Sequence, residues 1–216
     1  MEEVPLGGGW VNVGAVVRVG DTVRRPRCAN SPFVHEFLIG LERVGFDGAP
    51  RFLGIDDRGR EILSLLPGEP MPNEHDPTAD ELRSAAELLR RFHAAAPGVV
   101  HGDPGQWNML WVEGRATALV DFDGARRGAP LEDVGYLAWK ALRLGPAGQS
   151  AVQQRPRLAI LADAYGIAVD DALVAAIDGA MRSMRAKGER EDWQQDVLAA
   201  IDGERAWLRE KRDYLL

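Results

Sequence analysis

Two stretches of sequence decide the fold: VHGDPGQWNML at residues 100–110 and ALVDFD at residues 118–123. Between them, apolar runs flank Glu113-Gly114-Arg115, and this pattern predicts a β-hairpin, because glycine suits the positive φ of a tight turn. With the last two of these residues as the loop, Asn108 and Asp121 face each other, their Cβ atoms about 5 Å apart. An amide oxygen and a carboxylate at that spacing suit a hard cation such as Mg²⁺.

A second carboxylate, that of Asp103, belongs to the loop that enters this hairpin. The Pro104-Gly105 pair after it forces a turn, which we expect to keep the carboxylate close to Asn108 and Asp121. Phosphoryl transfer needs a carboxylate beside a metal-bound phosphate and within reach of a substrate hydroxyl. The stretch therefore predicts that chemistry.

Upstream of residue 67 the sequence indicates short strands and turns. Val16–Val19 and Thr22–Val23 form one predicted hairpin, and 51–66 contains a second. Ser31–Val44 is predicted as a helix in which Ser31 is the N-cap and proline follows at the first helical position. The apolar face of this helix consists of Val34, Phe37, Leu38, Leu41 and Val44.

The turn-forming segment Pro67-Gly68-Glu69-Pro70 marks a predicted boundary, with a nucleotide-binding lobe over residues 1–68 and a catalytic, acceptor-binding lobe over residues 69–216. Beyond it helices dominate, starting from a capping box at Thr78. We therefore predict an α+β protein, in which a small antiparallel β-rich lobe with one helix precedes a larger helical lobe.

Composition excludes several classes of protein. The 216 residues carry a formal charge of −7, and both halves of the chain are acidic, so nucleic acid is not an expected partner. No apolar run is long enough to cross a membrane, and the N-terminal residues lack a signal-peptide pattern. The one cysteine, Cys28, points to a reducing compartment. We predict a cytoplasmic protein whose acidic balance suits a cationic small-molecule partner.

The spacing His101-x-Asp103-x₄-Asn108, followed by Asp121, resembles that of the aminoglycoside phosphotransferase family, small-molecule enzymes related to protein kinases. His-Gly-Asp and Asp-Phe-Asp are typical of this small-molecule branch. The resemblance implies a protein-kinase-like two-lobed fold and transfer of a phosphoryl group from ATP or GTP. It also implies that Asp103 is the catalytic base, that Asn108 and Asp121 bind Mg²⁺, and that His101 holds the loop.

Further roles in the N-terminal lobe follow from the same resemblance. Gly7, Gly8 and Gly9 would form the loop that covers the phosphates, where backbone N–H groups approach phosphate oxygens. Leu65 and Leu66 would be the hinge whose backbone contacts the adenine edge.

The chain departs from the family pattern at the basic residue of the third strand, because it contains no lysine before Lys140. Arg24 fits that place best, since strand alternation puts it on one face with Thr22 and turns Arg25 to the other. The glutamate that should pair with this charge is not assigned, because Glu36 projects away from the apolar face of its helix.

Two alternatives stay open. The missing lysine and glutamate favour a pseudokinase that binds nucleotide or a partner without turnover. A zinc or iron hydrolase could instead use His93, His101, Asp103 and Asp121 as ligands. The acceptor itself is not identified: aminoglycosides fit the acidic balance, and sugars, choline-like alcohols and other antibiotics are equally compatible small hydroxylated molecules.

Overall fold

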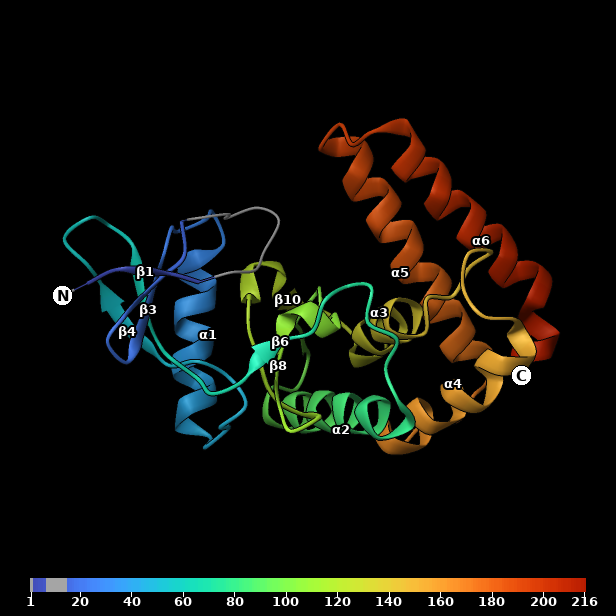
Figure 1. Ribbon diagram of the computed structural model, residues 1–216, viewed down its shortest axis with the longest axis horizontal. Helices are drawn as coiled ribbons and strands as arrows, with labels where there is room; N and C mark the ends of the chain where they lie inside the picture. Colours follow the sequence, from blue (N-terminus) through green and yellow to red (C-terminus); the bar gives the residue numbers. More distant parts are fainter. Residues whose placement is uncertain (1, 7–14) are drawn as a thin grey trace.

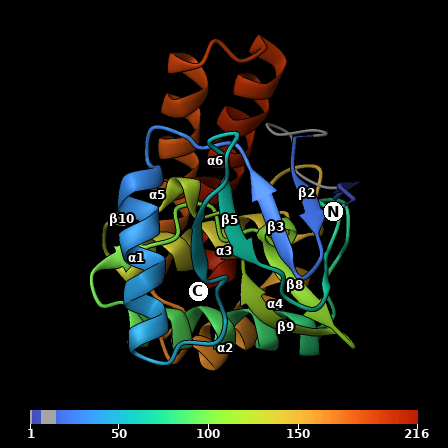
Figure 2. The ribbon, with the colours of Figure 1, turned by 90° about the vertical axis from the view of Figure 1, so that its left-hand side faces the viewer.

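The computed structural model describes residues 2–6 and 15–216. In its N-terminal part, antiparallel strands form a sheet in the order β1-β2-β3-β5-β4, and α1 (Ser31–Arg43) lies beside the sheet against β4 (Figures 1 and 2). The strands are β1 (Val4–Pro5), β2 (Val17–Val19), β3 (Thr22–Arg25), β4 (Phe52–Ile55) and β5 (Glu61–Ser64).

The remaining residues are mainly helical. The helices are α2 (Ala79–Ala95), α3 (Pro130–Leu142), α4 (Ala151–Tyr165), α5 (Asp171–Arg190) and α6 (Gln195–Leu215). Short strands build two further antiparallel sheets: β6 (Glu69–Pro70) with β8 (Met109–Val112) and β9 (Arg115–Leu119), and β7 (Val99–Val100) with β10 (Arg126–Arg127). Helices α5 and α6 extend side by side away from the rest of the molecule (Figures 1 and 2). The architecture is the expected α+β one, in which antiparallel strands and one helix precede a mainly helical part.

The core of the C-terminal part lies around α2 and α3. Phe92 and Trp139 are among the largest fully buried side chains. Helix α3 packs directly on α5, and a Cβ at Gly135 would lie 2.5 Å from the backbone carbonyl carbon of Ala176. This close approach fixes α3 in position, which matters because α3 supports the loop that carries Asp103.

Local signals in the sequence predict most elements correctly. The β2–β3 hairpin forms as expected, and Thr78 caps α2 in a capping box with Glu81. The start and end of α1 need correction. Its N-cap is Asn30 rather than Ser31, whose hydroxyl instead accepts a hydrogen bond from the Cys28 backbone. Val44 is 63% exposed, because the helix ends before it.

The hairpin that contains the predicted metal ligands has a different register from the expected one. Its loop residues are Glu113 and Gly114, which both have positive φ, as a tight two-residue hairpin turn requires. A β-bulge between Leu110 and Trp111 shifts the pairing again. Asn108 therefore lies across from Val120, whose N–H donates to the Asn108 carbonyl at 2.9 Å, and not directly across from Asp121.

The first residues after the expected lobe boundary already belong to the C-terminal part, since β6 pairs with β8. The division into residues 1–68 and 69–216 stays a prediction. Among the described residues, every helix is either too short or too polar to span a lipid bilayer.

Candidate active site

Asp103 lies on the loop between β7 and a short 3₁₀ turn, η1 (Gln106–Asn108). Its Oδ1 atom is buried, and no donor in the described residues forms a hydrogen bond with it. The preceding Gly102 has a φ of 84°, and a Cβ there would lie 2.4 Å from the carbonyl oxygen of Gly124. Only glycine fits this contact, so two backbone segments meet directly beside Asp103.

His101 holds this loop to the strand that precedes Asp121. Its Nε2 atom donates to the Val120 carbonyl at 3.0 Å, and its Nδ1 atom accepts from the Asp103 backbone N–H at 3.3 Å. The side chain is fully buried against the Phe122 ring, with centroids 4.7 Å apart. His101 is therefore a packing and hydrogen-bonding residue, as the resemblance implies.

Asp133, in the first turn of α3, holds the same loop from the other side. Its carboxylate accepts hydrogen bonds from the backbone N–H groups of His101 and Gly102, at 2.6 and 2.9 Å, and from His93 Nε2 at 3.0 Å. Tyr165 completes the network at His93 Nδ1, and burial together with the charge of Asp133 raises the pKa of Tyr165 to about 12. Tyr165 therefore stays a neutral donor.

We expect Asp133→Asn to destabilise the protein by about 3 kcal/mol, because the new NH₂ group would face backbone N–H groups that need an acceptor. Urea denaturation measures this loss. The matched control is Asp213→Asn, which changes an exposed carboxylate and should stay within about 0.5 kcal/mol of the wild type. Equal stability of the two variants would contradict the structural role of Asp133.

The two predicted Mg²⁺ ligands lie at adjacent points of the hairpin base. The Nδ2 atom of Asn108 donates to the Asp103 carbonyl at 3.0 Å, which leaves the amide oxygen free to bind a cation. Asp121 follows Val120 in a left-handed conformation, with φ 62° and ψ 63°, and its side chain is 44% exposed. One amide oxygen and one carboxylate are a donor set that suits Mg²⁺.

Arg25 is the basic residue that reaches Asp121. Its Nη1 atom lies 3.1 Å from Asp121 Oδ1, and Nη2 contacts Asp123. A third carboxylate, that of Glu61 on β5, lies 3.0 Å from Arg25 Nε as a charge contact outside hydrogen-bond geometry. Burial lowers the pKa of Arg25, but the three carboxylates outweigh burial and raise it.

Glu61 is an acidic side chain that the structure puts beside Arg25, whereas the sequence leaves such a partner unassigned. It comes from a neighbouring strand and not from the helix, which is why a search along Ser31–Val44 does not find it. The helix is still connected to this pair, because His35 Nε2 lies 2.7 Å from Glu61 Oε2. His35 also stacks on Phe52, with ring centroids 3.8 Å apart. Arg25 and Glu61 face each other in the antiparallel register of β3 and β5, and this strand pairing is not readable from residues that are neighbours in sequence.

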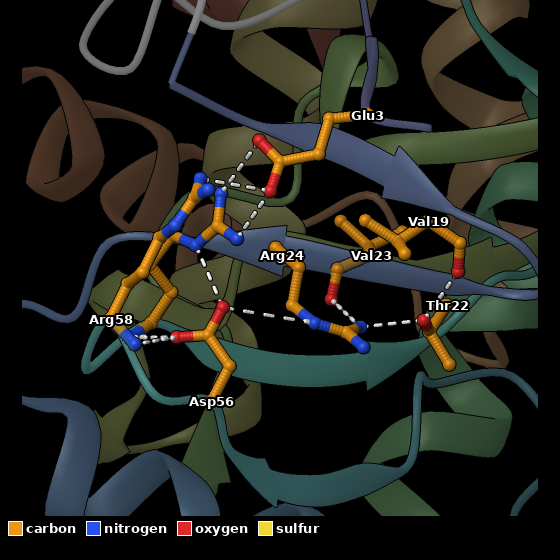
Figure 3. A network of polar contacts seen from close by, with 8 residues as sticks. Glu3, Val19, Thr22, Val23, Arg24, Asp56 and Arg58 are labelled. Atoms are coloured by element: carbon orange, nitrogen blue, oxygen red, sulfur yellow. Dashed lines mark hydrogen bonds and ion pairs between the residues drawn. The ribbon is translucent and has the colours of Figure 1, made fainter. Parts of the chain in front are cut away.

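Arg24 lies on the opposite face of the sheet. Figure 3 shows its side chain between Thr22 and Asp56, with contacts of 2.5 and 3.9 Å. Asp56 belongs to a network on that face with Glu3 and the arginines of the β4–β5 turn. Alternation along β3 is as expected, but it turns Arg25 and not Arg24 toward Asp121. The sequence-based choice of Arg24 is corrected in this respect.

The other predicted nucleotide contacts are Gly7, Gly8, Gly9, Leu65 and Leu66. The three glycines lie outside the described residues. Leu65 and Leu66 lie in the connection from β5 to β6 and are half-buried. The Leu65 N–H donates to the Asp21 carbonyl at 3.0 Å, so this amide is already occupied.

The geometry argues against the hydrolase cluster considered from sequence. Both ring nitrogens of His93 and of His101 are engaged in the hydrogen bonds described above. Within residues 2–6 and 15–216, no three His, Cys, Asp or Glu side chains are grouped so that they could hold a metal ion. A site built on imidazole ligands is therefore not proposed.

A family model and a known protein match the sequence of this chain. The model of the family described as "Phosphotransferase enzyme family" (APH) matches residues 20–185. The chain is also similar to the trifolitoxin immunity protein of Rhizobium leguminosarum bv. trifolii, with 26% identity over 254 aligned positions, which cover 100% of this chain and 95% of that protein.

Solved structures of antibiotic kinases share the fold. The gentamicin complex of APH(2″)-IIa superposes with a TM-score of 0.64 at 13% identity, covering 95% of this chain and 91% of that one. The amicoumacin kinase hAmiN, in complex with AMP-PNP, Ca²⁺ and its antibiotic, gives a TM-score of 0.61 at 11% identity, with coverage of 91% and 88%.

Proposed function

The chain belongs to the APH phosphotransferase enzyme family, and we propose that it transfers the γ-phosphoryl group of ATP or GTP, with Mg²⁺, to a hydroxyl group of a small molecule. The nucleotide would bind to the lobe of residues 1–68 and the acceptor to the lobe of residues 69–216. The exposed thiol of Cys28 fits a cytoplasmic location, where ATP is abundant and thiols stay reduced.

One observation carries the proposal: a continuous series of contacts joins Asp103, Asn108 and Asp121 to the buried guanidinium group of Arg25. Asn108 donates to the carbonyl of Asp103, Val120 donates to the carbonyl of Asn108, and the next residue, Asp121, pairs with Arg25. The residues that we propose as acceptor base, cation ligands and phosphate-binding charge are thereby joined by contacts of the chain. Pre-organised charge of this kind is what phosphoryl transfer requires.

Asn108 and Asp121 would hold the Mg²⁺ ion through the amide oxygen and the carboxylate. The chemistry that these two residues would bring to the site is charge neutralisation on the phosphate oxygens, which a bound Mg²⁺ ion would supply. Arg25 would contribute a second positive charge to the phosphates from the sheet, with Glu61 fixing its side chain. The Leu65 N–H already donates to the Asp21 carbonyl. At the hinge, we therefore expect the nucleotide's purine ring to contact the Leu65 carbonyl and the Leu66 N–H.

Asp103 would accept the proton of the acceptor hydroxyl. As that O–H bond breaks, the hydroxyl oxygen forms a bond to the γ-phosphorus, and the bond from the γ-phosphorus to its bridging oxygen breaks, which releases the nucleoside diphosphate. The position of Asp103 supports this role, because the loop that carries it is held beside Asn108, whose amide donates to the Asp103 carbonyl at 3.0 Å.

We expect Arg25→Met to weaken Mg-ATP binding by about 2 kcal/mol, the range of a charge-assisted contact, and the matched Arg24→Met to leave it nearly unchanged. Calorimetry measures both dissociation constants, and thermal melting checks that each variant is folded. Arg25→Lys keeps the charge and should restore most of the affinity. A larger loss in Arg24→Met than in Arg25→Met would contradict the assignment of Arg25.

The function itself is tested by a screen of hydroxylated metabolites and antibiotics with Mg-ATP and Mg-GTP, in which mass spectrometry detects a product heavier by one phosphoryl group. Aminoglycosides belong in the screen because a relative with this fold binds gentamicin. Firm nucleotide binding without any phosphorylated product would favour the alternative of a pseudokinase.

A further inference from the structure

Arg25 is joined to helix α1 by two contacts that run through one carboxylate. Glu61 is only 3% exposed, and its two oxygens face different side chains. Its Oε1 atom lies 3.0 Å from Arg25 Nε, and its Oε2 atom accepts from Nε2 of His35, on α1, at 2.7 Å. Because a buried carboxylate is costly unless charges or donors surround it, both partners stabilise the same negative charge. His35 is thus one carboxylate away from the proposed phosphate-binding group.

The His35 ring is fixed in orientation but not sealed from water. It stacks on Phe52 of β4, with ring centroids 3.8 Å apart and 14° between the planes. Since a carboxylate only accepts, Nε2 carries the proton shared with Glu61, and a second proton would go to Nδ1. The side chain is 14% exposed and borders a cavity of about 420 Å³ together with Arg27 and Cys28. His35 can therefore gain a proton without breaking its contact with Glu61.

Charged and titratable groups surround His35 on the elements packed against it. They belong to β5, to the connection from β3 to α1, to the 3₁₀ turn η2 (Phe122–Gly124) and to α1 itself, and are Glu61, Arg27, Cys28, Asp123 and Glu36. Among the described residues, Glu61 is the carboxylate in direct contact with the imidazole. A proton gained by His35 therefore acts first on Glu61 and, through it, on Arg25.

The charges around Arg25 are unbalanced while His35 is neutral. One guanidinium group faces the carboxylates of Glu61, Asp121 and Asp123, so one positive and three negative charges leave this cluster two charges negative. A proton on His35 halves that excess and draws part of the Glu61 charge away from Arg25. Because nucleotide phosphates are anions, both effects favour their binding beside Arg25.

We propose that His35 is a positioning residue whose protonation strengthens Mg-nucleotide binding, because the imidazolium neutralises Glu61 and leaves more of the Arg25 charge for the phosphates. This inference rests on the proposed function and adds a form of regulation to its nucleotide site. An imidazole ordinarily changes charge between about pH 5 and pH 8. Binding is then tight at the acidic end of that range and weakens as the pH rises through it. Because linkage is reciprocal, bound nucleotide in turn favours the protonated form of His35.

The test is calorimetry of Mg-ATP binding at about pH 6 and about pH 8, on either side of the usual titration of imidazole. The phosphates of ATP also titrate in this range, but they affect every variant equally. His35→Gln keeps a donor toward Glu61 and cannot gain a charge. The increase in dissociation constant from the lower to the higher pH should therefore be about 5-fold larger in the wild type than in His35→Gln, the lower end of the usual coupling between linked sites.

Two further variants separate the charge of His35 from its packing. His35→Lys stays charged at both pH values, so it should lose the pH dependence yet bind Mg-ATP more tightly than His35→Gln at the higher pH. His75→Gln is the matched control, because His75 forms a similar contact with Glu81, at 3.0 Å, and its variant should keep the wild-type pH dependence. Thermal melting at both pH values checks that each variant is folded.

Equal pH dependence in the wild type and His35→Gln would overturn the proposal, as would tighter binding by His35→Gln than by His35→Lys at the higher pH. Either result would leave the proposed function intact, because the wild type would still bind Mg-ATP. A wild-type protein that binds no Mg-ATP at either pH would instead contradict the proposed function.

Discussion

Asp103→Asn should lower kcat by about 10²- to 10⁴-fold, which is the usual contribution of a general base, while the dissociation constant of Mg-ATP stays within a few-fold. Asparagine keeps the shape of the side chain and removes its charge. The loop should keep its conformation, because hydrogen bonds of His101 and of the Gly102 backbone attach it to Val120 and Asp133.

The measurement is steady-state kinetics on an acceptor from the screen, together with calorimetry of Mg-ATP. The matched control is Asp123→Asn, which also removes one carboxylate but one that the mechanism does not use as a base. The kcat of this variant should fall far less than that of Asp103→Asn. If Asp103→Asn retained full turnover on a true substrate, the proposed mechanism would be wrong at its central step.

Asp121→Asn should weaken Mg-nucleotide binding by on the order of 100-fold or more, since loss of a ligand exceeds the 10- to 100-fold cost of disturbing a ligand's outer-shell partner. Asparagine is preferable to alanine here, because Asp121 has a φ of 62° and asparagine tolerates this left-handed conformation. The effect on affinity then reports the carboxylate and not backbone strain.

Calorimetry should be repeated for this variant in EDTA, where wild type and Asp121→Asn should bind nucleotide equally weakly. Asp123→Asn again serves as the control, because Asp123 also pairs with Arg25 but is not a proposed ligand. Unchanged Mg²⁺-dependent binding in Asp121→Asn would contradict the metal assignment.

Local sequence signals were sufficient for much of the fold. Hairpin turns, a capping box and helical periodicity depend on residues within a few positions of each other, so the β2–β3 hairpin and the start of α2 could be predicted from the chain alone. The family motif around Asp103 was equally accessible, because the loop, the 3₁₀ turn and the hairpin that follow it are continuous in sequence.

The register of the β8–β9 hairpin could not be predicted from the local sequence. Whether Gly114 is the first or the second loop residue depends on the φ of Glu113, and a β-bulge further along alters the pairing. Glycine-containing turns allow both registers, and only the packing of the two strands decides between them. Asn108 and Asp121 stay predicted Mg²⁺ ligands, and only the expected cross-strand register between them is wrong.

The sequence by itself determined the α+β organisation, the family and the motif residues, since each is encoded by neighbours along the chain. Only the tertiary structure decided which arginine reaches Asp121, that Glu61 lies beside that arginine, and that Asp133 holds the loop of Asp103. These contacts join residues from separate elements, and Arg25 and Asp121 are 96 positions apart in sequence. Their partners depend on how strands and helices pack, which no spacing within one element records.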